Sequence, residues 1–514
     1  MRLNRLSRSL TALSLVGALA FAAAPVAASD VTGSLRLDQP GSVIAPDVYG
    51  QFMEQLGTGI DEGIWVGPDS PIPNIRGYRT DVVEALRALK VPVVRWPGGC
   101  YADIYHWRDG IGPRADRPVT LNRWWGNKEE NNHFGTHEFF EFAELIGAKT
   151  YLSINVGSGT PAEAADWIEY ITAPGHSRLA ELRRANGRDA PWKIDYLGIG
   201  NETWGCGGRM RASYYADVYR QFVGFVNAPG TVTVAVGPNS NDEPWTRTLM
   251  EQARGDFDAL SLHYYTLPTG DWTTKGPALG FDEAQWIATF DQTYRMETMI
   301  QGHDAIMDQT DPEGKKILAV DEWGSWYDPT PGTNAGYLQQ QNSLRDALLA
   351  AANFNIFHRH ADRVRLANVA QMVNVLQAMI LTDGARMVLT PTYHAFALYQ
   401  PFQGATVLPL TLQSPAYGQV RAVDGTAARG ADGKVHIALI NLDPNEAADV
   451  VVSVEGGAAR RVSGQVLTAS ATDAHNDFDH TEAVRPAAFS GARVQNGRLT
   501  ARLPAKSLVV LTLD

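Results

Sequence analysis

The stretch Asp195-Tyr-Leu-Gly-Ile-Gly-Asn-Glu-Thr-Trp-Gly-Cys-Gly-Gly208 joins a short apolar run to an Asn-Glu pair and a glycine-rich turn. A nearly continuous apolar run of this length is typical of a parallel strand that is buried on both faces. Asn201 and Glu202 would then lie at the carboxyl end of that strand, where (β/α)₈ barrels place their catalytic groups. For a single Asn-Glu pair, the alternative is a loop glutamate that only caps the following helix.

A second apolar run, Lys316-Ile-Leu-Ala-Val-Asp-Glu-Trp-Gly-Ser-Trp-Tyr327, also ends in an acidic residue, and aromatic residues follow it. Glu322 is therefore the candidate partner of Glu202. Two carboxylic acids beside rings that can stack on a sugar are what glycoside hydrolysis requires, because one protonates the leaving oxygen and the other attacks or activates water. The pair indicates a glycoside hydrolase.

Six further apolar runs complete a set of eight predicted strands, and segments with helical spacing, such as 136–145, 213–226 and 339–357, lie between several of them. Eight such units predict an α/β fold with a (β/α)₈ TIM barrel. A doubly wound open sheet is the alternative fold, but the glycine clusters lack the spacing of a dinucleotide or phosphate loop. The six runs are residues 48–54, 91–100, 150–156, 232–237, 258–265 and 364–372.

The sequence pattern changes after Pro391, where short runs of alternating apolar and polar residues are separated by Gly, Asn, Asp and Pro turns. This pattern predicts an antiparallel β-sandwich, which we expect the alternating residues 31–38 to complete. A carbohydrate-binding module is the alternative to a supporting domain, although aromatic residues do not cluster there. We expect a barrel over residues 46–385 and a sandwich domain formed by residues 29–45 and 386–514.

Residues 1–28 have a basic start, an apolar core and a small-residue end, Val26-Ala27-Ala28, which predict a cleaved signal peptide and export to the periplasm or medium. A membrane anchor is the alternative, but the apolar core is short for a span. Cleavage removes three arginines and no acidic residue, so the formal charge would fall from −12 to −15. Such an acidic chain has no electrostatic footprint for nucleic acid or anionic lipid, and we expect a neutral glycan as its partner.

The two cysteines, Cys100 and Cys206, each follow a predicted barrel strand, so they either form a disulfide or remain two free thiols. The His133–His137 pair lacks the glutamate that follows the first histidine in zinc peptidases. We interpret it as structural, and we expect neither a metal nor a cofactor. Arg95 lies just inside the end of its strand, where burial is costly unless a carboxylate at the centre of the barrel pairs with it.

Seven motifs, in order and over most of the chain, resemble glycoside hydrolase family 51, the α-L-arabinofuranosidases. This family has a (β/α)₈ barrel and a β-sandwich, in agreement with the fold predicted above. The motifs are Gly50-Gln-Phe-Met-Glu-Gln-Leu-Gly57, Val94-Arg-Trp-Pro-Gly-Gly-Cys-Tyr-Ala-Asp103, His106-Trp-Arg-Asp-Gly-Ile-Gly-Pro113, Gly200-Asn-Glu-Thr-Trp-Gly205, Ser261-Leu-His-Tyr-Tyr265, Val320-Asp-Glu-Trp323 and Ala370-Gln-Met-Val-Asn374.

The resemblance implies that Glu202 is the general acid/base and Glu322 the nucleophile of a retaining double displacement. It further implies that Arg95 holds the nucleophile. Many members of the family have an asparagine at the position of Cys100, so one contact to a sugar hydroxyl must come from another group or from water. Residues implied to contact the arabinose ring or the catalytic pair are Glu54, Asn201, His263, Tyr265 and Gln371, and those implied to form hydrophobic walls of the sugar pocket are Trp107 and Trp326.

The function expected from the sequence is an exo-acting α-L-arabinofuranosidase that acts on arabinoxylan, arabinan or their oligosaccharides. One alternative is a glycanase of the same family type that cleaves β-xylosyl or β-glucosyl linkages, because the catalytic pair does not encode the sugar. A non-catalytic sugar-binding protein is the other alternative, but it should lack one of the two glutamates, and both are present. The sequence leaves the preferred linkage and a homo-oligomeric assembly open.

Overall fold

The computed structural model describes residues 29–226 and 228–514. The predicted signal peptide lies outside these residues. Each of the eight predicted runs overlaps one strand of a closed parallel barrel, so the predicted TIM barrel is confirmed. In order around the barrel the strands are β2 (Gly50–Phe52), β5 (Val93–Trp96), β8 (Lys149–Ile154), β9 (Tyr196–Ile199), β10 (Val232–Ala235), β11 (Ala259–Thr266), β12 (Ile317–Ser325) and β13 (Val364–Ala370).

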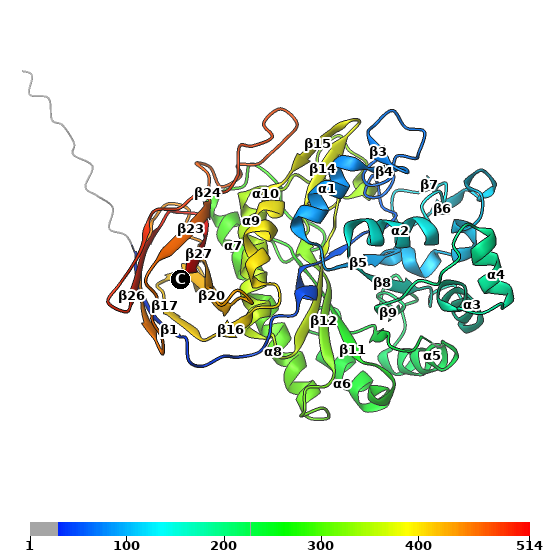
Figure 1. The fold of residues 1–514 in the computed structure, drawn as a ribbon, viewed down its shortest axis with the longest axis horizontal. Coiled ribbons are helices and arrows are strands. Elements are labelled where there is room, and N and C mark those ends of the chain that lie inside the picture. Colours follow the sequence, from blue (N-terminus) through cyan, green and yellow to red (C-terminus); the bar gives the residue numbers. More distant parts are fainter. Residues whose placement is uncertain (1–28, 227) are drawn as a thin grey trace, which may run out of the picture.

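Helices surround the barrel, as Figure 1 shows. One predicted helix begins later than expected: α9 starts at Leu344 because Ser343 and Asp346 form a capping box there. The side chain of Gln340, just before it, instead donates to the backbone oxygen of Ser325 at the end of β12. The larger helices are α1 (Thr80–Leu89), α2 (Thr136–Ile146), α3 (Pro161–Thr172), α4 (Arg178–Ala185), α5 (Ala212–Phe225), α6 (Glu243–Gln252), α7 (Glu283–Thr293), α8 (Arg295–Asp308), α9 (Leu344–Arg359) and α10 (Pro391–Tyr399).

Two sheets form the predicted β-sandwich, and β1 (Ser29–Arg36) joins one of them as expected. That sheet is antiparallel except at β1, which runs parallel to β22 (Ala448–Glu455). Buried Val450 and Val452 alternate with more exposed residues on β22, so one face of the strand packs into the core between the sheets. The other strands are β17, β26 and β25 (Leu410–Gln413, Arg498–Leu503, Ala492–Gln495), and in the second sheet β16, β20, β21, β27, β23 and β24 (Thr406–Leu408, Val423–Arg429, Val435–Asn441, Ser507–Leu513, Val462–Leu467, Ala487–Ala488).

Helices α7, α9 and α10 lie between the barrel strands and the sandwich (Figure 1). Trp286 on α7 is fully buried, and its indole N–H donates to the carbonyl of Leu442 in the sandwich at 2.8 Å. On α9, the guanidinium of Arg359 pairs with Asp424 of β20 at 3.2 Å. Helix α10 packs on α9, beyond the expected boundary at residue 385, and that division of the chain stays a prediction.

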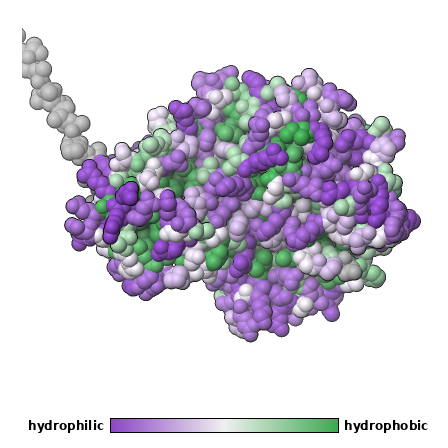
Figure 2. Space-filling model, viewed as in Figure 1, coloured by the Kyte–Doolittle hydropathy of each residue, from purple (hydrophilic) through white to green (hydrophobic). Residues whose placement is uncertain are grey.

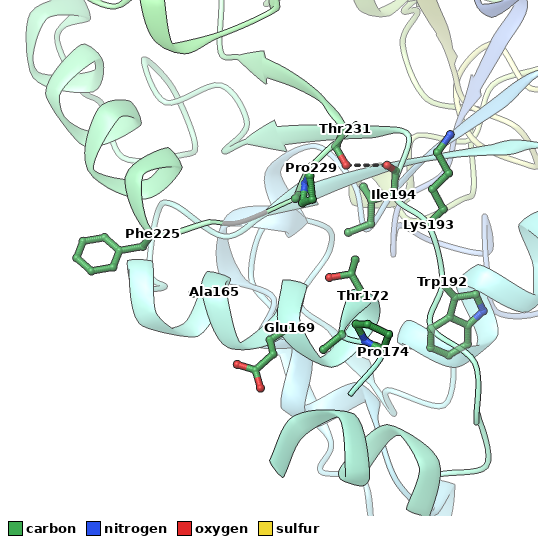
Figure 3. Close-up of a pocket in the computed structure, with 12 residues that line it drawn as sticks. Ala165, Glu169, Thr172, Pro174, Trp192, Lys193, Ile194, Phe225, Pro229 and Thr231 are labelled. Atoms are coloured by element: carbon green, nitrogen blue, oxygen red, sulfur yellow. Dashed lines mark hydrogen bonds between the residues drawn. The ribbon is translucent and has the colours of Figure 1, made fainter. Parts of the chain in front are cut away.

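The surface in Figure 2 is mostly hydrophilic, with small, separate hydrophobic patches. In the part of the chain that the structure describes, no helix combines the length and apolar character needed to cross a membrane. A hollow of about 550 Å³ lies at the end of the barrel where the strands begin, between α3 and the segment that follows α5. Figure 3 shows Phe225 at the edge of this hollow, and the hydroxyl of Thr231 donates to the carbonyl of Ile194 at 2.8 Å.

We predict that Trp286→Ala lowers the free energy of unfolding by about 3–5 kcal/mol, because it removes a large buried side chain at the junction of barrel and sandwich. The matched control is Phe225→Ala, which truncates an aromatic side chain that is 65% exposed. We expect the control to change stability by less than about 0.5 kcal/mol. Denaturant titration of both variants measures the difference, and equal effects would contradict this account of the junction.

Candidate active site

The carboxyl ends of six barrel strands bring most of the sequence-predicted site residues together. Parallel strands in a closed barrel all end on the same face, so residues far apart in the chain meet there. Arg95 lies on β5, Asn201 and Glu202 follow β9, His263 and Tyr265 lie on β11, Glu322 lies on β12, Gln371 follows β13, and Glu54 follows β2.

Glu322 is buried and held at both carboxylate oxygens. The guanidinium of Arg95 donates to Oε2 at 2.9 Å, and the hydroxyl of Tyr265 donates to Oε1 at 2.6 Å. Arg95 also donates to the side-chain oxygen of Asn201 at 2.5 Å, and its guanidinium lies over the ring of Phe52, 4.5 Å from the ring centroid. The charge-assisted bond from Arg95 and the bond from the Tyr265 hydroxyl together fix the orientation of this carboxylate.

Glu202 lies in a left-handed backbone conformation with φ of 40°. This conformation costs a residue with a side chain about 1–3 kcal/mol, so the surrounding structure must hold it. The carboxylate of Asp103 accepts the N–H of Asn201 at 2.9 Å, and the N–H of Gly205 donates to the carbonyl of Glu202 at 2.7 Å. The loop that presents Glu202 is therefore fixed from both sides.

Burial and the nearby negative charge of Glu322 raise the pKa of Glu202, against the hydrogen bond with His263, which acts in the opposite direction. The Nδ1 atom of His263 lies 2.9 Å from Oε1 of Glu202 and 3.2 Å from Oε2 of Glu322. One atom of each of these three side chains lies within 4.8 Å of the others. Retaining glycosidases hold their carboxyl groups about 5–5.5 Å apart, whereas inverting enzymes need about 6.5–9.5 Å.

Glu54 is buried beside the catalytic pair and accepts three hydrogen bonds, from the backbone N–H of Tyr101 (2.9 Å), the indole of Trp125 (2.8 Å) and the side chain of Gln371 (3.1 Å). Burial and the charge of Glu322, opposed by the donors of Tyr101 and Trp125, raise the pKa of Glu54 to about 7. Gly98 makes this approach of the chain to Glu54 feasible: its φ is 152°, and a Cβ atom there would lie 2.4 Å from Cγ of Glu54.

The two predicted tryptophan walls differ in position. Trp326 is half-buried and packs edge-on against Tyr265, with ring centroids 4.8 Å apart. Trp107 lies elsewhere: it is buried in a short 3₁₀ helix against α3, where its indole donates to the carbonyl of Glu163 and its ring packs on Tyr170. These contacts pack Trp107 against α3, and its role as a wall of the sugar pocket stays a prediction.

Cys100 and Cys206 are joined by a disulfide, with Cα atoms 5.5 Å apart. The bond ties the 3₁₀ helix that follows β5 to the loop that carries the acidic residue, and Sγ of Cys206 lies 3.7 Å from Oε2 of Glu202. Of the two outcomes left open by the sequence, the structure shows the bonded one.

Sequence reasoning missed several residues of this site. Asp321 is buried directly before Glu322, and Tyr151 donates to it at 2.6 Å. Trp272, which is 51% exposed, packs edge-on against Trp326 with ring centroids 5.1 Å apart. A carboxylate inside an apolar run was the available signal for Asp321, whereas Trp272 comes from a loop whose sequence carries no comparable pattern.

Two groups of side chains in the described part of the chain bring three potential metal ligands within 4.8 Å of one another. Glu202, His263 and Glu322 form the first, in which Arg95 and Tyr265 already hold Glu322. The second combines Glu202 with the two disulfide sulfurs. Both groups centre on Glu202, and the first has the charge pattern of a paired acid and carboxylate.

Comparison with known proteins connects this geometry to an enzyme family. Residues 85–285 match the family described as "Alpha-L-arabinofuranosidase 1 domain", and residues 321–507 match "Alpha-L-arabinofuranosidase C-terminal domain". The chain is 46% identical to an "Intracellular exo-alpha-L-arabinofuranosidase" from Bacteroides ovatus, over 96% of this chain and 98% of the relative.

Solved structures give the same result. A family 51 arabinofuranosidase from Xanthomonas axonopodis pv. citri is 56% identical with a TM-score of 0.94, over 95% of this chain and 100% of that one. The arabinose complex of an α-L-arabinofuranosidase from Thermotoga maritima is 29% identical with a TM-score of 0.83, over 94% of this chain and 99% of that one.

The comparisons correct one expectation. We expected export, but the Bacteroides ovatus relative, which aligns over nearly the whole chain, is named an intracellular enzyme, and the prediction of an exported protein is therefore wrong. The activity is a different matter, because the relatives, the matching families and the paired carboxylates agree. The chain belongs to glycoside hydrolase family 51 and is an α-L-arabinofuranosidase.

Proposed function

We propose that the protein releases terminal arabinofuranosyl residues from arabinoxylan, arabinan or their oligosaccharides with retention of configuration. The observation that supports retention is the placement of one oxygen each of Glu202 and Glu322 within 4.8 Å of the other. Such a spacing favours retention, because inverting enzymes hold their carboxyl groups farther apart to leave room for a water molecule. The exo mode is proposed from the printed name of the Bacteroides ovatus relative.

In the first step, a carboxylate oxygen of Glu322 bonds to the anomeric carbon as the glycosidic bond breaks. Glu202 gives its proton to the leaving oxygen. In the second step, a water oxygen bonds to the anomeric carbon, the bond to Glu322 breaks, and Glu202 takes a proton from that water. The contacts of Arg95 and Tyr265 with Glu322 support its role as an ionised nucleophile, and the raised pKa of Glu202 supports its role as the acid.

Glu54, Gln371 and Asn201 are proposed to bind hydroxyl groups of the arabinose ring. Glu54 and Asn201 present polar groups at the same end of the barrel, and Gln371 connects to them through Glu54. Trp326 and Tyr265 offer an apolar edge beside Glu322 for the sugar ring. Cys100 has no side-chain amide with which to contact a sugar hydroxyl. We propose that neighbouring groups or water make that contact instead.

Substitution of the two glutamates tests these roles. We expect Glu202→Ala to slow substrates with poor leaving groups by about 10²- to 10⁴-fold, while an activated aryl arabinofuranoside still gives a burst, because Glu322 still forms the intermediate. Azide should then restore turnover of Glu202→Ala and give an arabinosyl azide of retained configuration. Glu322→Ala should show no burst, because it lacks the nucleophile. A burst in Glu322→Ala, or the absence of a burst in Glu202→Ala, would contradict the roles assigned to the two glutamates.

The pH dependence provides a second test. Because the pKa of Glu202 is raised, the group stays protonated to a higher pH than an ordinary glutamate, and kcat/KM should fall on the alkaline side as it loses its proton. With an activated aryl substrate, which needs no acid, Glu202→Ala should lack this alkaline limb. Rate measurements across pH with both enzymes check the assignment, and an unchanged limb in the variant would assign it to another group.

The disulfide provides a third test. It closes a loop over a sequence separation of 106 residues, for which chain entropy gives about 4–5 kcal/mol of stability as an upper value. We expect Cys100→Ser/Cys206→Ser to lower the melting temperature and to slow substrates with poor leaving groups more than activated ones, because the loop carrying Glu202 loses a tether. Equal slowing of both substrate types would show that the bond does not act through the acid/base.

A further inference from the structure

Asp321 and Glu322 are consecutive residues on β12, yet both approach the same arginine and histidine. Successive side chains of a regular strand point to opposite faces, so two neighbours cannot normally do this. Strand β12 carries one extra residue here relative to both of its partners, since its register shifts between Ala319 and Glu322 against β11 and between Val320 and Trp323 against β13. This bulge turns both carboxylates toward the centre of the barrel.

Asp321 is 1% exposed and makes close contacts with three side chains. The hydroxyl of Tyr151 donates to its Oδ2 at 2.6 Å, and Nε of Arg95 lies 3.9 Å from the same oxygen. On its other side, Oδ1 lies 3.3 Å from Nε2 of His263. Burial of a charged carboxylate without such partners would cost free energy. The contacts of Asp321 offset that cost and stabilise its charge.

His263 is engaged at both ring nitrogens by carboxylates. Its Nε2 faces Asp321, while its Nδ1 lies 2.9 Å from Glu202 and 3.2 Å from Glu322. The ion-pair contact of 3.3 Å between Nε2 and Asp321 orients the ring, and a proton on Nδ1 then points at the catalytic pair. Burial would by itself lower the pKa of His263, but the charges of Glu322 and Asp321 outweigh it and raise the pKa to about 10.

We propose that Asp321 is a positioning residue that acts through His263 and keeps its Nδ1–H directed at Glu202 through both halves of the reaction. The inference rests on the roles proposed above for Glu202 and Glu322. The third carboxylate, Asp321, is needed in the second half of the reaction, in which the glycosyl-enzyme is hydrolysed. Once the glycosyl-enzyme forms, Glu322 is an ester and carries no charge, so Asp321 is then the anion that remains at Nε2 to stabilise a charged imidazole.

Asp321 is suited to this constant role. Burial acts to raise its pKa, but Arg95 and His263 outweigh burial and hold the pKa below its ordinary value, so the group stays ionised over the working range. The titratable and charged groups that face this network from the surrounding strands are Arg95 of β5, Tyr151 of β8, Glu202 after β9, Tyr265 of β11, Glu322 of β12 and, beyond Glu322, Glu54 after β2.

Asp321→Asn tests the proposal, because it keeps the shape of the side chain and removes its charge. In the glycosyl-enzyme, His263 would then face Glu202 alone and lose its proton at lower pH. Glu202 would lose a donor, its pKa in that state would rise, and the acid limb of kcat should move to higher pH. We expect kcat on an activated aryl arabinofuranoside to fall about 10- to 100-fold and KM to fall with it, because the intermediate accumulates.

Intact-protein mass spectrometry during turnover should therefore detect the arabinosyl adduct in Asp321→Asn. In a His263→Ala background, the same substitution should change kcat by no more than about twofold, because the residue through which Asp321 acts is gone. The matched control is Asp346→Asn, which removes a buried carboxylate that accepts from Ser325 and Tyr327 at the end of β12. It should lower the melting temperature without moving the acid limb.

The proposal is overturned if Asp321→Asn leaves the acid limb in place and shows no adduct, or if kcat/KM and kcat fall together as in a merely destabilised enzyme. A full additional loss in the His263→Ala background would also overturn it. These outcomes are separable from failure of the catalytic assignments, because azide rescue of Glu202→Ala tests Glu202 and Glu322 without any change at Asp321.

Discussion

The active site is organised around the buried guanidinium of Arg95. Arg95 is 1% exposed and contacts the side chain of Glu322, the side chain of Asn201 and the backbone carbonyl of Asp321. Removal of one partner from a buried charge pair costs about 3–5 kcal/mol, because the other charge stays in a medium of low polarity. Strands β5, β9 and β12 are therefore fixed relative to one another by the same group that orients the nucleophile, and stability and catalysis share one set of contacts.

The two glutamates are held by different means. Glu322 lies within a strand, and hydrogen bonds from rigid neighbours orient it. Glu202 lies beyond the end of its strand in a strained backbone conformation, so it needs Asp103 and the Cys100–Cys206 bond to hold its loop. This difference matches their proposed tasks, because a nucleophile must stay ionised in one place while an acid/base gains and loses a proton during each turnover.

The disulfide connects the site to the redox state of its surroundings. Disulfides persist in oxidising compartments, whereas cytosolic glutathione and thioredoxin keep thiols reduced. The Bacteroides ovatus relative is named an intracellular enzyme. In a reducing compartment the loop that carries Glu202 would lose its covalent tether and rely on Asp103 and the local turn.

The sequence by itself determined the eight barrel strands, the strand that completes the sandwich and the two glutamates, because each is encoded locally by an apolar run and the residue that ends it. It also carried the family motifs. Only the tertiary structure decided that Trp107 packs on α3, that Cys100 and Cys206 are bonded, and that Asp321 faces His263. These depend on a strand bulge and on distances between segments far apart in the chain, and local sequence patterns contain no information about either.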